Sequence, residues 1–196
     1  GVDACALTEF TMDELQGGDP GEYEYQSAGT ISVDGGGLSL DLEPQDLEGV
    51  LSYQQTIPEA QFTFGIDYDV SATGDGFPAF SGVLPMTDRL QIISPDVGEG
   101  MFPILEGDLA VEWSGADGSD AGLFLTMTGE DEWGAVIICI VHNDGSFAIP
   151  ANLIDQLPQG TGTLLVEQYR WTETTVGGRS LALFAGSAAM GLGIKP

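Results

Sequence analysis

The stretch from 134 to 157 reads GAVIICIVHNDGSFAIPANLIDQL, and it decides the fold because a long uncharged apolar run meets a tight turn there. Residues 135–141 are all apolar and rich in β-branched side chains, and they are too few to span a membrane. This pattern predicts a strand covered on both faces. Residues 143–145 tolerate positive φ and residues 146–149 resume the alternation, so we expect a β-hairpin.

Short alternating segments, separated by Gly, Asp and Pro turns, occupy most of the remaining chain. Helical spacing is confined to residues 8–15 and to 150–157, which start at a proline. The spacing therefore predicts an all-β, antiparallel β-sandwich with at most short helical turns. The expected strands are 22–26, 29–33, 38–42, 47–55, 61–70, 77–85, 89–95, 108–113, 123–127, 163–171 and 180–194.

The length of 196 residues allows one large β domain or two small ones. There is no fixed-period repeat and no low-complexity linker. We therefore expect one continuous domain over residues 1–196, with residues 85–89 as the place for a sub-boundary.

The charge balance is extreme, with 31 Asp and Glu residues against 4 Lys and Arg and a formal net charge of −27. Such a surface repels phosphates and anionic lipids, which excludes nucleic-acid binding. Salt-adapted, calcium-loaded and secreted proteins all share this composition. A hydrophobic content of 42% indicates a folded chain. No apolar run of about 18 residues exists, so we expect no membrane insertion.

The first residue is Gly rather than Met, which is typical of a mature form after signal removal or of a trimmed chain. The sequence thus favours a secreted, extracellular or cell-surface protein. In an oxidising compartment Cys5 and Cys139 are expected to form a disulfide that ties the N-terminus to the central strand. The alternative is a buried free thiol at Cys139.

Catalytic side chains are scarce. His142 is the only histidine, and strand geometry points it to the face opposite Cys139, so no Cys-His pair forms and a structural role is the better interpretation. Asp67 and Asp69 lie two residues apart on one strand face, where a hydrolase, a glycan or a cation could use them. The alternative is an exposed polar face. No catalytic residue is predicted.

Metal and sugar sites have weak signals. Asp117, Asp120 and the acidic run Glu130, Asp131 and Glu132 lie in turns that suit calcium, the only cofactor that the sequence leaves open. Ordinary turn chemistry explains them equally well. Trp133 is the tryptophan expected at the surface, where a glycan can stack, whereas Trp113 and Trp171 are expected in the core.

The apolar tail has few polar positions for a terminal strand, and it could complete the sheet of a neighbouring subunit by strand addition. The alternative is pairing within its own subunit. The residues of this candidate assembly strand are Ser180, Leu181, Leu183, Phe184, Met190, Leu192 and Ile194.

Residues 61–170 carry a set of motifs that resembles uncharacterised secreted bacterial β-domains. They share a Val/Leu-x-Trp strand, a strand with a lone Cys, a Gly-x-Phe-x-Val/Ile-Pro hairpin and a Leu-Pro-x-Gly-x-Gly turn. The resemblance implies export and an immunoglobulin-like sandwich, and it implies no catalytic residues. The segments that carry it are 78–80, 93–95, 108–114, 138–139, 144–151, 157–158 and 162–166.

Together these observations favour a non-catalytic structural or interaction protein of the cell exterior, such as a self-assembling fibre subunit. The alternatives are a carbohydrate- or calcium-binding module and, third, a hydrolase that uses acidic residues.

Overall fold

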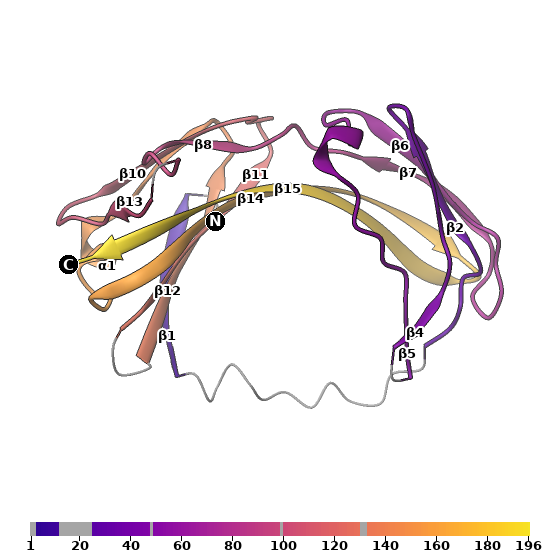
Figure 1. The fold of residues 1–196 in the computed structure, drawn as a ribbon, viewed down its shortest axis with the longest axis horizontal. Coiled ribbons are helices and arrows are strands. Elements are labelled where there is room, and N and C mark those ends of the chain that lie inside the picture. Colours follow the sequence, from indigo (N-terminus) through magenta and orange to yellow (C-terminus); the bar gives the residue numbers. More distant parts are fainter. Residues whose placement is uncertain (1–2, 12–24, 48, 99, 130–132) are drawn as a thin grey trace. The chain divides into compact units, whose positions relative to one another are not determined.

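The computed structural model describes residues 3–11, 25–47, 49–98, 100–129 and 133–196, and these form an almost entirely β structure (Figure 1). The all-β class is confirmed. No helix among these residues is long and apolar enough to cross a bilayer. The helical segments in the described part of the chain are a 3₁₀ turn, Glu59–Gln61, and α1, Ala151–Ile154. The strands are β1 Ala4–Thr11, β2 Ile31–Gly35, β3 Leu38–Leu42, β4 Gln45–Leu47, β5 Val50–Ser52, β6 Asp67–Ala72, β7 Phe80–Pro85, β8 Gln91–Ser94, β9 Phe102–Pro103, β10 Leu109–Ser114, β11 Asp120–Thr128, β12 Trp133–His142, β13 Ser146–Ile149, β14 Gly160–Val176 and β15 Arg179–Lys195.

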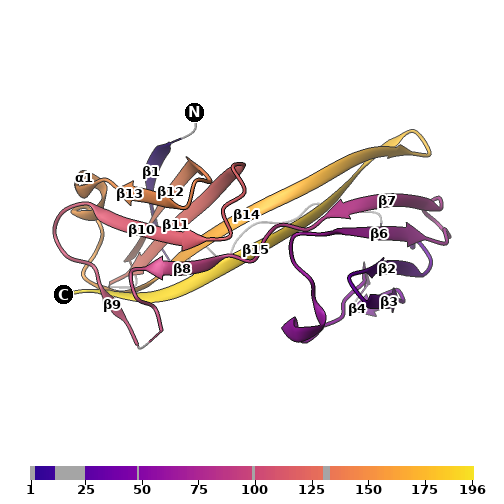
Figure 2. The same ribbon diagram turned by 90° about the horizontal axis from the view of Figure 1, so that it is seen from above.

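The chain divides into two compact units. Unit 1 contains residues 1–19, 88–169 and 187–196, and unit 2 contains residues 20–87 and 170–186. The division between Thr87 and Asp88 falls in the segment 85–89 where the sequence allows a boundary. The long strands β14 and β15, seen in Figures 1 and 2, contribute residues to both units.

Unit 1 consists of two sheets with a core between them. The six-stranded sheet has the order β1-β12-β11-β14-β15-β9, and the three-stranded sheet has the order β13-β10-β8. Figure 2 shows β8, β10 and β13 on one side of β11 and β12. Buried residues of both sheets meet in one cluster, which includes Leu123, Leu125 and Ile137 from the larger sheet and Val111, Trp113 and Ile149 from the smaller.

Unit 2 is built on a four-stranded sheet of order β3-β2-β6-β7, with a separate β4-β5 hairpin. Its core centres on Tyr68, which is 1% exposed. The Tyr68 hydroxyl donates to the carbonyl of Thr63 and accepts from its backbone N–H, at 3.0 and 2.9 Å. Phe62, Phe64 and Ile66 pack against the same core.

The expected hairpin between residues 135–141 and 146–149 is wrong. β12 pairs with β1 and β11, whereas β13 pairs with β10 in the other sheet. The turn is held by distant partners, because the buried Asn143 side chain accepts from Trp113 Nε1 at 2.8 Å and donates to Gln168 Oε1. The backbone N–H of Trp113 also donates to the Gly145 carbonyl at 2.9 Å. Residues 143–145 therefore carry the chain from one sheet to the other.

The expected burial of β12 on both faces is also wrong. Ala135, Ile137, Cys139 and Val141 are fully buried, while Ile138 and Ile140 are exposed. The alternation of strand side chains puts the first set into the core and the second set on the outside of the sheet. An all-apolar strand thus has only one covered face in unit 1.

Several predicted boundaries and one tryptophan need correction. The expected helix at 8–15 is strand β1 up to Thr11, because pairing with β12 outweighs local propensity, and its last four residues lie outside the described part. The expected strand at 47–55 is a hairpin that turns at Gly49, where φ is +89°. The strand expected at 61–70 begins only at Asp67, since Gly65 has a φ of +72°. Residues 25–26 of the strand expected at 22–26 are not in a strand, and its other residues lie outside the described part. Trp171, expected in the core, is 59% exposed.

Candidate functional site

The outer face of the six-stranded sheet is the main candidate site, and the name means the side chains that point away from the unit 1 core. The strand register places its side chains in rows. One row joins Ala6, Ile138, Phe124 and Leu165 across β1, β12, β11 and β14. This row contains only carbon side chains, so it offers neither charge nor hydrogen bonds to water.

The neighbouring row of the outer face joins Ala4, Ile140, Gly122 and Glu167. Gly122 leaves room for an aromatic ring, since a Cβ there would lie 2.7 Å from the Phe124 ring. The Phe124 ring thus fills the space above Gly122 in the apolar surface.

Strand β15 extends the outer face beyond β14. Met190 and Leu192 are 64% and 52% exposed, and Ile194 is exposed beside them. A Cβ added at the intervening Gly191 or Gly193 would point inward and collide with Val97 or Phe102, at 2.2 and 2.9 Å respectively. Small residues on the inner side and large ones on the outer side therefore put the apolar bulk of β15 on the surface.

Glu167 is the carboxylate in these rows. It accepts a hydrogen bond from the Tyr169 hydroxyl, and this bond, burial and the Glu167 charge together raise the pKa of Tyr169 to about 12. Both residues lie on the same side of β14, two positions apart. The tyrosine thus covers the carboxylate of Glu167.

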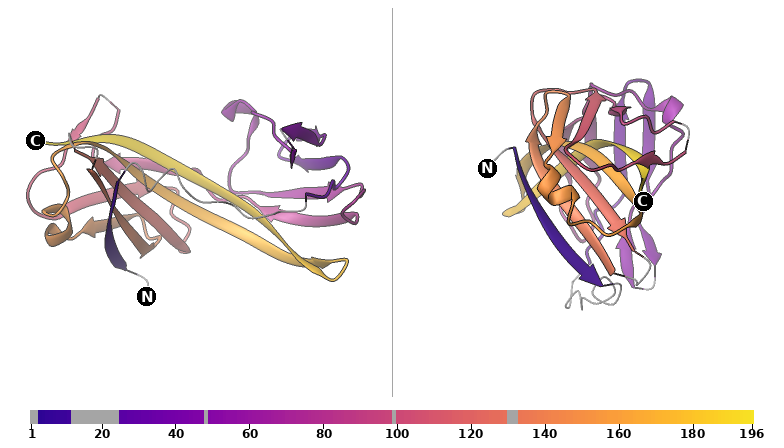
Figure 3. Two further views of the ribbon diagram at one scale, coloured as in Figure 1. Left: turned by 90° about the horizontal axis from the view of Figure 1, so that it is seen from below. Right: turned by 90° about the vertical axis from the view of Figure 1, so that its left-hand side faces the viewer.

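The edge of the outer face is fixed by a disulfide. Cys5 and Cys139 are directly opposite in the register of β1 and β12, with their Cα atoms 4.0 Å apart, and their sulfur atoms are bonded at 2.08 Å. Figure 3 shows the indigo strand β1 at the margin of the sheet. The predicted pairing is the one present, and Cys139 is buried as a half-cystine rather than as a thiol.

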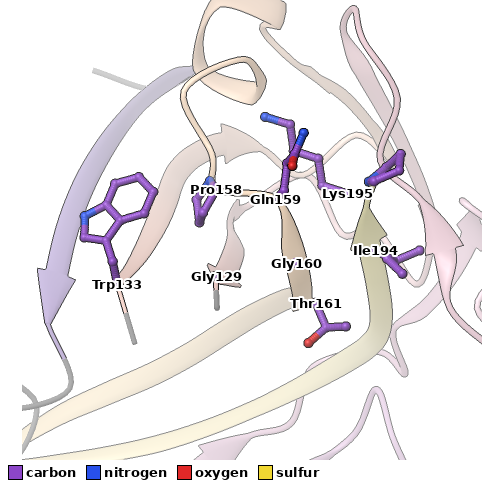
Figure 4. A pocket seen from close by; sticks show the side chains of 9 residues that line it. Gly129, Trp133, Pro158, Gln159, Gly160, Thr161, Ile194 and Lys195 are labelled. Atoms are coloured by element: carbon purple, nitrogen blue, oxygen red, sulfur yellow. The ribbon is translucent and has the colours of Figure 1, made fainter. Parts of the chain in front are cut away.

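A second candidate site is a pocket of about 680 Å³ at the end of unit 1 where β11 ends and β12, β14 and β15 have their termini. Figure 4 shows Trp133 and Pro158 near each other, with Gln159 and Thr161 toward β14 and Lys195 above them. Trp133 is half-buried, so its predicted surface position holds in part. The lining residues are Gly129, Trp133, Pro158, Gln159, Gly160, Thr161, Ile194, Lys195 and Pro196.

Lys195 at this pocket stabilises the loop before Pro158 through hydrogen bonds of its ammonium group. Its Nζ donates to the carbonyls of Ile154, Asp155 and Leu157 at 2.8, 3.3 and 2.7 Å. These carbonyls belong to α1 and the turn after it, where a cation is favoured. The ammonium is thus saturated and holds the loop that leads to Pro158.

Asp67 and Asp69 lie on an exposed polar face of unit 2. Both are exposed on β6, and Asp69 is directly opposite Asp34 of β2. Their alternation with buried Tyr68 and Val70 is the solvent face that the sequence allows as the alternative. Neither aspartate lines the pocket beside Trp133 or the pockets lined by Pro78 and by Gly36.

The calcium candidates are dispersed or engaged. Asp117 Oδ1 accepts from the Ser119 N–H at 3.0 Å and from Asn143 Nδ2 at 2.9 Å, so it caps a turn. Asp120 begins β11 and is exposed. Glu130, Asp131 and Glu132 lie outside the described residues. Within the described ranges no three His, Cys, Asp or Glu side chains gather to hold a metal ion.

The terminal segment forms strand β15, which pairs with β14 and, in parallel, with β9 in its own sheet. Its backbone is therefore engaged within the subunit, as in the alternative drawn from the sequence. Ser180, Leu181, Leu183 and Phe184 belong to unit 2, and Met190, Leu192 and Ile194 belong to unit 1. What this segment offers to another molecule is the exposed row of apolar side chains.

Sequence reasoning missed Ile138 and Ile140, because an all-apolar strand contains no polar position to mark its outward side. It also missed the exposed pair Trp171 and Phe184, whose ring centroids lie 6.5 Å apart. His142 is exposed at the end of β12, on the face opposite Cys139, as expected. No protein-family model, curated protein or solved structure matches the chain.

Proposed function

We propose that this chain is a structural protein of the cell exterior that works by self-association, and that two copies pack through the outer face of the six-stranded sheet. The observation that carries this proposal is the exposure of Ile138, Ile140, Met190, Leu192 and Ile194 on one sheet face of a chain with a net charge of −27. Contiguous apolar surface of this kind is typical of a contact site.

The architecture of unit 1 supports the proposal that a further layer, from a second copy, covers the outer face. A sheet with an apolar face is stable when another layer covers that face. The inner face of the six-stranded sheet is covered by β13, β10 and β8, whose core residues pack against it. Two central rows of the outer face are apolar apart from Glu167, and the rows on either side add threonines and the pair Asp120 and His142. Sheets pack on each other at about 10 Å through apolar side chains.

The negative charge of the chain and the neutral side chains of the outer face favour a second copy as the partner that covers this face. A basic partner would be recognised by carboxylates, but the two central rows of the outer face hold Glu167, which is bonded to Tyr169, and Asp120 lies at their margin opposite His142. An anionic lipid surface is repelled by the acidic chain. Two copies that meet through this face bury neutral side chains and keep most of their carboxylates apart.

A dimer through one self-complementary face is closed, so growth into a fibre requires a different contact. Strand β1 is the edge of the six-stranded sheet, and β12 is its pairing partner among the described residues. A free edge of this kind accepts another strand. We propose the β1 edge as the second contact in a fibre, and electron microscopy of the purified protein checks it.

The immunoglobulin-like and exported character is part of the same proposal. Most motifs of the resemblance lie in unit 1, including the Trp113 strand, the Cys139 strand and the 144–151 segment. The disulfide suits an oxidising compartment.

Sedimentation velocity with light scattering tests the self-association over a range of protein, salt and calcium concentrations. Association should strengthen as salt rises, because screening reduces the repulsion between acidic copies. The variant Ile140→Thr/Leu192→Thr should weaken association roughly 100-fold, since two aliphatic contacts are lost from the interface.

Val83→Thr in unit 2 is the matched control, since Val83 and Ile140 are both 43% exposed on strands. The control should associate like the wild type. A wild-type protein that stays monomeric at all concentrations of protein, salt and calcium rejects the proposal.

A further inference from the structure

We infer that the pocket beside Trp133 binds a neutral carbohydrate. This goes beyond self-association, since it assigns a ligand to a pocket that shares Ile194 with the proposed contact surface. The pocket volume of about 680 Å³ lies within the roughly 300–1,000 Å³ of small-molecule sites. It is large enough for a short oligosaccharide.

The charge of the chain disfavours anionic ligands. An anion meets a chain of net charge −27, and the ammonium of Lys195 already donates to three carbonyls. Anionic sugars and nucleotides are thus disfavoured.

The remaining groups match the two sides of a sugar ring. A pyranose presents a face of C–H groups and a rim of hydroxyl groups. The rings of Trp133 and Pro158 supply apolar surface on one side of the pocket, as Figure 4 shows. The exposed side chains of Gln159 and Thr161 supply an amide and a hydroxyl that both donate and accept hydrogen bonds.

The pocket is also held in shape before any ligand arrives. The Gly129 N–H donates to the Trp133 carbonyl at 2.9 Å, which closes the approach of β11 to β12. Gly160 lies so close to β11 that a Cβ would be 2.1 Å from the Thr128 carbonyl oxygen. Lys195 holds the turn before Pro158. A preformed site loses less entropy on binding.

Titration calorimetry and ligand-detected NMR with cellobiose, maltose, lactose and chitobiose test the inference, with glucuronic acid as the anionic comparison. At least one neutral disaccharide should bind with a Kd of about 1 mM or tighter, and glucuronic acid should bind more weakly. Trp133→Ala should weaken binding by about tenfold or more, while Trp133→Phe should retain most of it.

Trp171→Ala is the control, because it removes an exposed tryptophan from unit 2 and should leave the Kd unchanged. Thr161→Val removes only a surface hydroxyl and should weaken binding without loss of folding, which guards against an unfolded Trp133 variant. Absence of binding by all four disaccharides overturns the inference. Equal binding by Trp133→Ala, or stronger binding of glucuronic acid, also overturns it. Sedimentation of the same samples reports on self-association independently.

Discussion

Two sheet faces of this chain have opposite chemistry although the same strand alternation builds both. The outer face of the six-stranded sheet in unit 1 carries Ile138, Ile140 and Leu192. The exposed face of the four-stranded sheet in unit 2 carries aspartates and serines, among them Asp34, Asp69 and Ser71. In a chain this acidic, the two central rows of the unit 1 face hold one carboxylate, Glu167, and it is bonded to Tyr169. The comparison therefore supports the proposal that the unit 1 face is a contact surface, whereas the unit 2 face has the polarity of a solvent surface.

The largest expected effect concerns the disulfide, which holds β1 to the edge of the unit 1 sheet. The variant Cys5→Ala/Cys139→Ala should destabilise unit 1 by roughly 3–5 kcal/mol, because a bond across 134 residues restricts the unfolded chain. Urea unfolding followed by fluorescence of the buried Trp113 measures this loss.

Reduction of the wild-type protein should lower the free energy of unfolding of unit 1 by the same amount. The far-ultraviolet circular dichroism that comes from unit 2 should be retained. Peptide mapping without reductant should recover Cys5 and Cys139 in one linked pair. Two free thiols in that map would contradict this part of the account.

A smaller effect is expected from the acidic face of unit 2. Asp34 and Asp69 are directly opposite, so their like charges repel across the strands. Asp69→Asn should raise the free energy of unfolding of unit 2 by about 0.2–1 kcal/mol at low salt, and the gain should shrink as salt rises. Thermal unfolding at two salt concentrations measures it.

Asp41→Asn is the matched control on the same face. The Asp41 carboxylate accepts a hydrogen bond from Ser32 at 2.6 Å, so its loss should not stabilise the protein. An equal gain from both variants would mean that general charge reduction, rather than the facing pair, is responsible.

The smallest effect is a pH dependence on the unit 1 face. The pKa of Tyr169 is raised from 10.0 to about 12, so the folded state holds this proton more tightly than the unfolded state. Its stabilisation is complete below pH 10 and is lost as pH rises from 10 to 12. The free energy of unfolding of Tyr169→Phe, measured by urea unfolding, should therefore fall less than that of the wild type between pH 10 and 12. Below pH 10 the two proteins should show the same dependence on pH.

The two faces also show what the sequence can predict. The strand β6 alternates Asp and Ser with Tyr68 and Val70, and the structure has the exposed and buried sides that this pattern predicts. In β12 every residue from Ala135 to Val141 is apolar, so the pattern contains no information on which side is covered. The all-β class and most strand positions follow from local alternation, whereas the coverage of a face depends on distant elements.

The turn at 143–145 illustrates the same limit for topology. Asn143, Asp144 and Gly145 have the composition of a hairpin turn, and the local pattern predicts pairing of β12 with β13. The pairing is decided by Trp113 and Gln168, which bind the Asn143 side chain from other strands. No short-range pattern reports such partners. For the candidate sites, Trp133 was identified as a surface residue, but its pocket also needs residues 158–161 and 194–196.

Methionine oxidation in the wild-type protein tests the contact surface most directly. Met190 lies on the outer face and is 64% exposed, and Met101 lies elsewhere in unit 1 and is 49% exposed. Both should react with dilute hydrogen peroxide at low protein concentration, while the buried Met86 and Met127 should not. As protein concentration or salt increases, Met190 should become protected and Met101 should keep its rate. Equal oxidation rates of Met190 at all concentrations would contradict the proposal that a second copy covers this face.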